Sequence, residues 1–175
     1  VFYVGSAGEF QLLDRDADGV FRYRSTVDAG KINVKEWRQL EARKGASEFI
    51  FTGADRFWRL PTQADAWTRV VQQGYETDLE AVHYSYVAGA DFDEDGRVDL
   101  IAVDGQSHVV ELLEQGASQW ESRMFWEVFE QNLHYQGRTG SKVEPREVVV
   151  GDFTGDGKLD FAFLVHDRIL FYPQE

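Results

Sequence analysis

Two nine-residue segments of the chain share one unusual spacing of acidic residues and glycine. The first is Asp91-Phe-Asp-Glu-Asp-Gly-Arg-Val-Asp99, and the second is Asp152-Phe-Thr-Gly-Asp-Gly-Lys-Leu-Asp160. They start at positions 91 and 152, a separation of 61 residues, so they also mark a long sequence repeat. Glycine at position 6 of each segment allows a sharp turn that residues with side chains adopt only at a cost.

The alternating oxygens of these segments predict two calcium loops. Ca²⁺ takes six to eight oxygen ligands at roughly 2.3–2.6 Å, and alternate residues of a curled loop point toward one centre. Side chains at positions 1, 3, 5 and 9 and the carbonyl at position 7 meet this demand. The expected ligands are Asp91, Asp93, Asp95, Arg97 (carbonyl) and Asp99 in the first loop, and Asp152, Thr154, Asp156, Lys158 (carbonyl) and Asp160 in the second.

An EF-hand begins with the same spacing but is excluded here. That loop needs a bidentate Glu at position 12 and a helix on each side. Position 12 is Ala102 in the first loop and Phe163 in the second, and the residues around them are rich in strand formers. The segments are therefore predicted to be strand–loop–strand sites. The alternative is an acidic surface turn that binds no metal.

Aligning the chain on the last acidic residue of each loop gives a repeat of four antiparallel strands. The apolar runs 48–60 and 160–172 align without a gap, and 1–13 and 99–113 fit the same frame. Third runs follow at 20–24, 67–71 and 120–126, and fourth strands are expected at 82–88 and 147–150, before each loop. Four-stranded units of about 50–60 residues are typical of β-propeller blades.

The predicted fold is therefore all-β, with β-propeller blades in a single domain over residues 1–175. The units run roughly over 1–47, 48–98, 99–159 and 160–175, which gives about three to four blades. We expect the chain to be an excerpt of a longer one and its blades to belong to a larger ring, completed by missing residues or by a partner chain. Closure as a four-bladed ring is the alternative. The strand edges at 1–4 and 169–172 are expected to pair with each other, with another chain or with further residues.

Two other segments resemble the loops without keeping their pattern. Asp14, Asp16 and Asp18 precede Gly19, but position 9 is Arg22, and the repeat register favours an acidic hairpin tip. In the second unit the register places Leu40 at position 1, Lys44 at position 5 and Glu48 at position 9. This pattern indicates a lost site in which the Lys44 ammonium replaces the cation and pairs with a carboxylate; neutral drift is the alternative.

The two loops with their flanks, Gly89-Ala-Asp-Phe-Asp-Glu-Asp-Gly-Arg-Val-Asp-Leu-Ile and Gly151-Asp-Phe-Thr-Gly-Asp-Gly-Lys-Leu-Asp-Phe, resemble FG-GAP/VCBS repeats. The best-known relatives of these repeats are the calcium-loop blades of integrin α-subunit propellers. The resemblance implies a calcium-stabilised β-propeller of secreted or cell-surface proteins. It implies roles in adhesion, in ligand binding or as an accessory domain of larger enzymes. The first two units depart from the pattern.

Composition narrows the choice of partners. The formal net charge is −13 and the pI is about 4.7, so nucleic acid and anionic membrane surfaces are improbable partners. The absence of Cys excludes disulfides and thiol catalysis. No run of eighteen apolar residues is present. Calcium loops of modest charge suit millimolar Ca²⁺, so we expect a secreted, periplasmic or cell-surface protein.

Nothing in the sequence indicates catalysis. The four histidines are scattered, no nucleophile or phosphate-binding motif is present, and the informative acidic pairs already indicate calcium. Trp67 and Trp120 occupy equivalent repeat positions and are expected to pack between blades. Trp37, Trp58 and Trp126 do not repeat and are candidates for a ligand surface, as is the basic cluster of Arg138, Lys142 and Arg146.

The predicted function is a non-catalytic, calcium-binding module outside the cytoplasm that binds a protein or a glycan. The alternatives are an accessory or catalytic propeller of a larger polysaccharide-active enzyme, suggested by the resemblance alone, and a scaffolding subunit of a membrane-associated assembly. A glycan or enzymatic role predicts exposed Trp in a groove with carboxylates. A scaffold predicts a flat, mostly apolar contact face.

Overall fold

The computed structural model describes residues 2–4, 10–27, 36–43, 46–61, 72–117, 119–128, 143–165 and 168–174. Regular structure in these ranges consists of antiparallel strands, which confirms the predicted all-β class. No helix long and apolar enough to cross a membrane occurs in these ranges. Lys44, Trp67, Arg138 and Lys142 lie outside them, as do the side chains of Trp37 and Glu48.

The strands form four separate sheets, numbered here along the chain. Sheet 1 contains β1 (Phe2–Val4), β2 (Phe10–Arg15) and β3 (Phe21–Val27). Sheet 2 contains β4 (Glu36–Arg43), β5 (Ala46–Thr52), β6 (Arg56–Pro61) and β7 (Gln72–Glu76). Sheet 3 contains β8 (Tyr86–Ala90), β9 (Asp99–Asp104), β10 (Val109–Gln115) and β11 (Trp120–Glu127). Sheet 4 contains β12 (Glu147–Gly151), β13 (Asp160–Val165) and β14 (Arg168–Tyr172).

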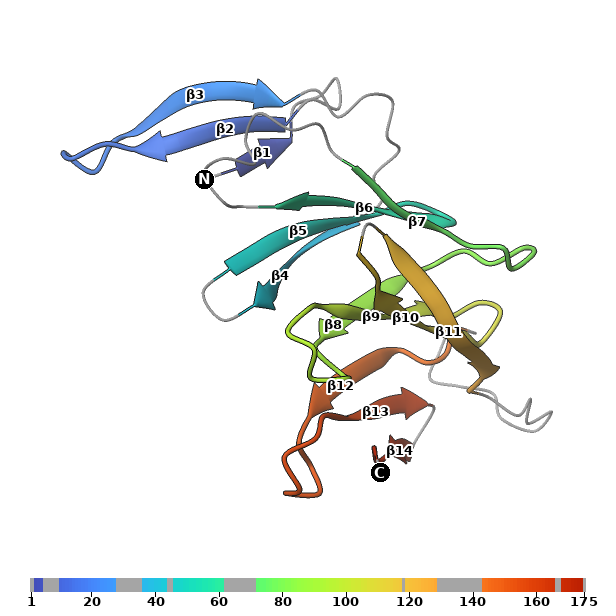
Figure 1. Ribbon diagram of the computed structural model, residues 1–175. Coiled ribbons are helices and arrows are strands. Elements are labelled where there is room, and N and C mark those ends of the chain that lie inside the picture. Colours follow the sequence, from blue (N-terminus) through green and yellow to red (C-terminus); the bar gives the residue numbers. More distant parts are fainter. Residues whose placement is uncertain are drawn as a thin grey trace.

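The four sheets follow one another as an open stack, with the chain ends at opposite ends of it (Figure 1). Among the described strands, β1 pairs only with β2 and β14 only with β13. The two terminal edges therefore do not pair with each other, and the four-bladed closure that the sequence left open is not formed. Membership of a larger propeller stays a prediction.

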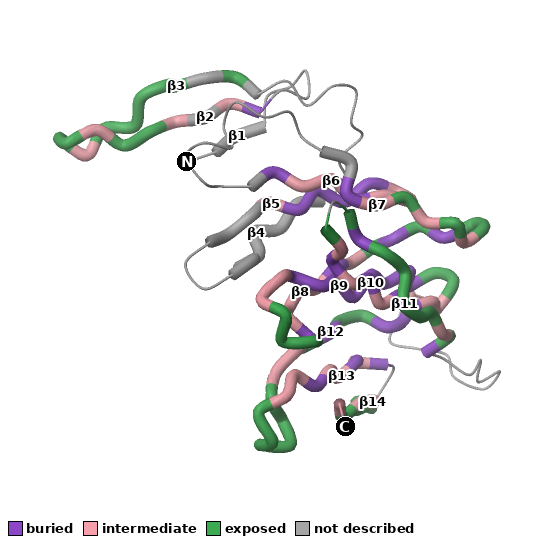
Figure 2. The backbone as a smooth tube through the Cα atoms, viewed as in Figure 1, coloured by how far each residue is buried: buried purple, intermediate pink, exposed green. Residues whose placement is uncertain are grey.

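The β9 strand of sheet 3 is buried on both faces because sheets 2 and 4 pack against its two sides. All six residues of β9 are buried, as Figure 2 shows for the centre of the stack. Leu100 and Ala102 join a core cluster with Ile50 of sheet 2, whereas Ile101 and Val103 join a second cluster that includes sheet 4. Period-2 alternation thus sends successive side chains into two different cores, which explains why β9 reads as a continuous apolar run.

Each predicted loop joins two neighbouring strands of one sheet. Ala90 pairs with Asp99 across the first loop, and Gly151 pairs with Asp160 across the second. The strand before a loop therefore belongs to the same sheet as the strand after it. The sequence units 99–159 and 160–175 begin at the last residue of each loop. Each of them therefore leaves out the first strand of its sheet, which is β8 in sheet 3 and β12 in sheet 4.

Most of the segment predicted as a lost calcium loop belongs instead to two paired strands. Leu40 pairs with Glu48, and Arg43 pairs with Ala46, so β4 and β5 extend through the positions that a loop would occupy. Two residues lie between the strands, too few for the predicted nine-residue loop. The expectation of a degraded loop at 40–48 is therefore wrong, and the pairing of Lys44 lies outside the described residues.

The tryptophans that the structure describes pack between strands and sheets. Trp120 is 1% exposed and donates a hydrogen bond from Nε1 to the carbonyl of Val98 (2.9 Å), which confirms its packing role. Trp126 lies half-buried among aromatic rings of sheet 4, with the Phe163 ring centroid 6.3 Å away. The proposal of Trp126 as a ligand-surface residue is thus wrong, because it fills the interface between sheets 3 and 4.

A polar cluster also joins sheets 2 and 3. The buried carboxylate of Glu111 accepts hydrogen bonds from the hydroxyls of Tyr75 (2.7 Å), Tyr84, Ser122 (2.5 Å) and Thr77 (3.2 Å). Burial, followed by the Glu111 hydrogen bond, raises the pKa of Tyr75 to about 12 and also raises that of Tyr84. Hydroxyl donors therefore satisfy this carboxylate, as a buried charge requires.

We predict that replacing Gly74 with Ala destabilises the fold. Gly74 lies in β7, and an added Cβ would be 2.2 Å from a ring carbon of Trp120. The Trp120 ring is buried and hydrogen-bonded to the Val98 carbonyl, so it has little room to move. Overpacking of this kind costs about 1–3 kcal/mol of unfolding free energy. Urea denaturation measures the loss, and Gly151→Ala in β12 is the control because its Cβ would meet ring carbons at 3.5 Å. Equal stability of the two variants would contradict the packing described.

We also predict that stability falls between pH 10 and pH 12. An unfolded tyrosine ionises near pH 10, whereas Tyr75 in the folded chain keeps its proton until about pH 12. The folded state therefore binds more protons across this window, so the unfolding free energy decreases as the pH rises. Tyr75→Phe should make the decrease shallower in denaturation series, and Tyr23→Phe, which removes an exposed hydroxyl far from Glu111, should not.

Candidate metal site

Both loops turn through glycine residues in the left-handed region. Gly96 has φ +82° and Gly157 has φ +92°, which confirms the role predicted for position 6. Position 4 also has positive φ in both loops, with Glu94 at +61° and Gly155 at +79°. Glycine adopts such angles freely, whereas a residue with a side chain is strained there. The backbone of the first loop is therefore strained at Glu94.

The two loops share four equivalent hydrogen bonds. In both, the carboxylate at position 1 accepts from the glycine N–H at position 6, and the carboxylate at position 5 accepts from the N–H at position 7. The carboxylate at position 9 accepts from the N–H at position 2 and from a glutamine N–H beyond the loop. These bonds lie between 2.8 and 3.0 Å. The sequence repeat is thus also a repeat of local structure.

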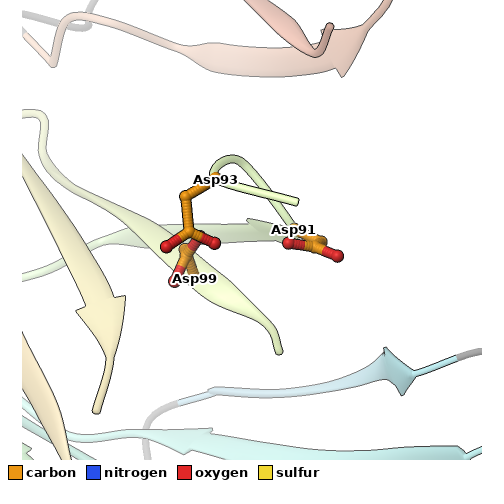
Figure 3. Close-up of side chains that lie close together, drawn as sticks. All are labelled: Asp91, Asp93 and Asp99. Carbon is orange, nitrogen blue, oxygen red and sulfur yellow. The ribbon is translucent and has the colours of Figure 1, made fainter. Parts of the chain in front are cut away.

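The first loop gathers three of its expected ligands. One carboxylate oxygen each from Asp91, Asp93 and Asp99 lies within 4.8 Å of the others (Figure 3). In the same view the carboxylates of Asp93 and Asp99 lie beside each other, with that of Asp91 to one side. The Oδ1 atom of Asp91 is buried without a hydrogen-bond partner. An unpartnered buried carboxylate oxygen is costly, and a bound cation would satisfy it.

Asp95 does not join this cluster. Its side chain forms an ion pair with the guanidinium of Arg97, and its Oδ1 accepts from the Arg97 backbone N–H at 2.8 Å. The residue expected at ligand position 5 is therefore paired with the residue whose carbonyl was expected at position 7. Sequence spacing identified both residues and could not show that their side chains pair.

Burial sets the electrostatics of Asp99. This residue is 2% exposed, and desolvation raises the pKa of its carboxyl above the usual range, with further increases from the charges of Asp93 and Asp95. In the second loop, three backbone hydrogen bonds, that from Gln174 foremost, lower the pKa of Asp160 despite its burial. The same motif position thus carries an acid whose negative charge is disfavoured in one loop and favoured in the other.

The second loop is more open. Residues 152–157, which include the expected ligands Asp152, Thr154 and Asp156, are exposed. Asp152 already accepts two backbone hydrogen bonds, from Gly155 at 2.6 Å and Gly157 at 3.0 Å. Among the described residues, the 4.8 Å grouping of carboxylates occurs at the first loop and not here. Lys158 contributes its N–H to Asp156.

The acidic segment at 14–19 forms the predicted hairpin tip between β2 and β3. Asp16 accepts hydrogen bonds from the backbone of Asp18 and Val20 and forms an ion pair with Arg22 at 2.6 Å. Arg22, foremost, holds the pKa of Asp16 below its usual value. Asp14 pairs with Arg24 at 2.7 Å. Ion pairs with arginines of the same hairpin therefore compensate the negative charges of Asp14 and Asp16.

Two glutamines that sequence reasoning missed help to hold the loops. Gln115 and Gln174 donate their backbone N–H groups to the position 9 carboxylates; Gln115 ends β10, and Gln174 lies two residues after β14. Gln174 also donates from Nε2 to the carbonyl of Phe92 at 2.8 Å, which ties the end of sheet 4 to the first loop. The two glutamines occupy equivalent positions in the sequence repeat, and this equivalence could have identified them from the sequence.

Of the predicted basic cluster, the structure describes Arg146, whereas Arg138 and Lys142 lie outside the described residues. Arg146 forms an ion pair with Glu144 at 3.3 Å, so at least this cation has a partner within the chain.

Comparison with family profiles finds no match to the chain, and neither curated proteins nor solved structures match it. The resemblance to FG-GAP/VCBS repeats thus stays a prediction that depends on the loop residues.

Proposed function

We propose that this chain is a non-catalytic calcium-binding module that acts by binding another protein outside the cytoplasm. The observation that carries the metal assignment is the cluster of Asp91, Asp93 and Asp99 in a loop whose backbone hydrogen bonds recur at Asp152–Asp160. The FG-GAP/VCBS-like spacing supports the same assignment. A larger β-propeller is the architecture that this spacing favours.

The donors present fit a hard cation. All are carboxylate oxygens, as Ca²⁺ prefers, and the orphaned Asp91 Oδ1 supplies a ligand atom already removed from water. A bound Ca²⁺ would offset the burial and the like charges that disfavour the anion of Asp99. Asp95 could become a ligand of the ion only after its ion pair with Arg97 is broken. When bound, the ion would crosslink the two ends of the loop between β8 and β9 and so stabilise the fold.

Protein binding is favoured over glycan binding by where the aromatic and apolar residues lie. Of the described tryptophans, Trp58 and Trp126 are half-buried and Trp120 is buried, which leaves no exposed tryptophan groove among them. Exposed apolar side chains gather instead on sheet 4, around a hollow of about 470 Å³. A largely apolar contact face is the feature expected of a scaffolding or protein-binding module.

The calcium affinity expected of this site agrees with the proposed extracytoplasmic location. Three clustered carboxylates on a partly exposed loop suit dissociation constants of about 10⁻⁴–10⁻³ M, the range of extracellular modules. Such a site would be filled by millimolar Ca²⁺ and left empty at cytosolic concentrations. Secreted, periplasmic and cell-surface settings all satisfy this condition.

We predict that Asp93→Asn weakens calcium binding at the first loop by at least about tenfold, because it removes one charge from the cluster. Isothermal titration calorimetry measures affinity and stoichiometry. Glu94→Gln is the matched control, since it removes the same charge one residue away and outside the cluster. Asp156→Asn tests the second loop in the same way.

Thermal melting provides an independent readout of the same proposal. Calcium should raise the melting temperature of the wild-type chain, and a chelator should reverse the rise, because the ligand binds only the folded state. Asp93→Asn should lose most of this response and Glu94→Gln should keep it. Identical melting curves with calcium and with chelator, together with no heat of binding, would exclude the calcium assignment.

We further predict that Arg97→Gln strengthens calcium binding at the first loop. The substitution frees Asp95 from its ion pair, which on a partly exposed loop stabilises by about 0–1 kcal/mol. The expected gain is therefore at most about fivefold in affinity. Arg123→Gln, which breaks the exposed ion pair with Glu114 in sheet 3, is the control and should leave affinity unchanged. Weaker binding by Arg97→Gln would show that Arg97 supports the site.

A further inference from the structure

The outer face of sheet 4 is apolar and open. Strand alternation sends Phe163 and Val165 toward sheet 3 and leaves a second set of side chains on the opposite side. We call this second set the end face; it comprises Val149, Phe153, Ala162, Leu164, Ile169 and Phe171, with Glu147 at its rim. Ile169 is 70% exposed, and Phe153 is 52% exposed. Apolar patches of this kind mark interaction sites.

The end face has a position-by-position counterpart in sheet 3. Strand pairing shows the equivalence: Ala162 pairs with Val149 and Phe171, just as Ile101 pairs with Ala88 and Leu112. The same registers match Leu164 and Ile169 to Val103 and Val110. The hydrogen bonds of the two loops match Phe153 to Phe92.

Every counterpart in sheet 3 packs in the core that sheet 4 covers. Phe92 is 8% exposed there, whereas Phe153 at the same motif position is 52% exposed. The six counterparts, Ala88, Phe92, Ile101, Val103, Val110 and Leu112, all belong to this core. The end face is thus built as a sheet-packing surface, and the occupant that fits it is another antiparallel sheet.

The stack itself identifies a matching surface at its other end. Sheet 1 packs on sheet 2 through Phe10, whose ring lies 4.4 Å from that of Phe51. Leu13 and Arg15 alternate with Phe10 along β2, so they lie on the face directed away from sheet 2. Their partners on β3 are Tyr23 and Phe21, which are 61% and 50% exposed. We call these four residues the head face.

We propose that a second copy of this chain covers the end face with its head face. Inside one chain, sheets 2, 3 and 4 each pack one face on the sheet that precedes them. The head face is the corresponding face of sheet 1, which has no preceding sheet among the described residues. The end face of a second copy would supply that sheet. Charges agree as well, because Glu147 borders the end face and the Arg15 guanidinium lies over the Phe21 ring of the head face at 6.0 Å.

This contact joins two different surfaces and is therefore heterologous. It produces a closed ring if successive rotations close and an open chain of copies if they do not. The two faces lie at opposite ends of the stack, so one copy can use both at once (Figure 1). The inference deepens the protein-binding part of the proposed function and does not depend on calcium.

The experiment is sedimentation velocity on the chain and on two face variants, at about 1–100 μM, the range in which weak association is measurable. Ile169→Glu places a charge on the end face, and Phe21→Glu places one on the head face. Phe125→Glu on β11 is the matched control, since Phe125 is 58% exposed and belongs to neither face. Circular dichroism and melting curves check that each variant is folded.

We expect the wild-type chain and Phe125→Glu to self-associate and each face variant alone to lose at least about tenfold in association. An equimolar mixture of the two face variants should recover a single contact, because Ile169→Glu keeps its head face and Phe21→Glu keeps its end face. Calorimetry of calcium binding is read separately, so failure of either proposal is visible without the other.

Three outcomes would overturn the proposal. A wild-type chain that stays monomeric throughout would show that something other than a second copy covers the end face. Loss of association in Ile169→Glu but not in Phe21→Glu would indicate an isologous contact between two end faces. Loss in Phe125→Glu equal to that of the face variants would move the contact to β11.

Discussion

The buried carboxylate at the end of each loop is the interaction on which both the site and the stack depend. Asp99 accepts one backbone hydrogen bond from Phe92 at the start of its loop and another from Gln115 at the end of β10. These bonds fold the loop back over its own hairpin and place the Phe92 ring in the core between sheets 3 and 4. The Asp99 side chain therefore sets the shape of the first loop and also places Phe92 where it packs between the two sheets. Asp160 makes the same two bonds in sheet 4.

Because sheets 2 and 4 pack on opposite sides of sheet 3, its strand β9 is buried on both faces and contributes to both apolar clusters. The four central residues of β9, 100–103, each contribute to one of two clusters, so a charge introduced at any of them would be buried whichever face it occupied. The polar cluster around Glu111 is tolerated within the same interface because four hydroxyls surround the carboxylate. Two kinds of contact, apolar and hydrogen-bonded, thus fix sheet 2 on sheet 3.

Local patterns in the sequence were enough to predict the loops, the strand-rich class and the third runs at 20–24 and 120–126, which overlap the observed β3 and β11. They could not reveal features that depend on distant contacts. β4 has a polar composition, Glu36-Trp-Arg-Gln-Leu-Glu-Ala-Arg43, and forms a strand because β5 pairs with it. Trp126 has no repeat counterpart and is half-buried because rings of sheet 4 surround it. Spacing likewise placed Asp95 in the ligand set, although its side chain pairs with Arg97.

The two loops differ mainly in what lies over them. The first is packed against sheet 4 through Phe92 and Gln174, and burial there raises the pKa of Asp99. The second lies beside the open end face, where Phe153 is exposed and backbone donors lower the pKa of Asp160. A sheet placed on the end face would cover Phe153 as sheet 4 covers Phe92, and it would bring the second loop toward the environment of the first. The surroundings of each loop therefore depend on the sheet packed beyond it, because each loop lies at the rim of the interface that follows its own sheet.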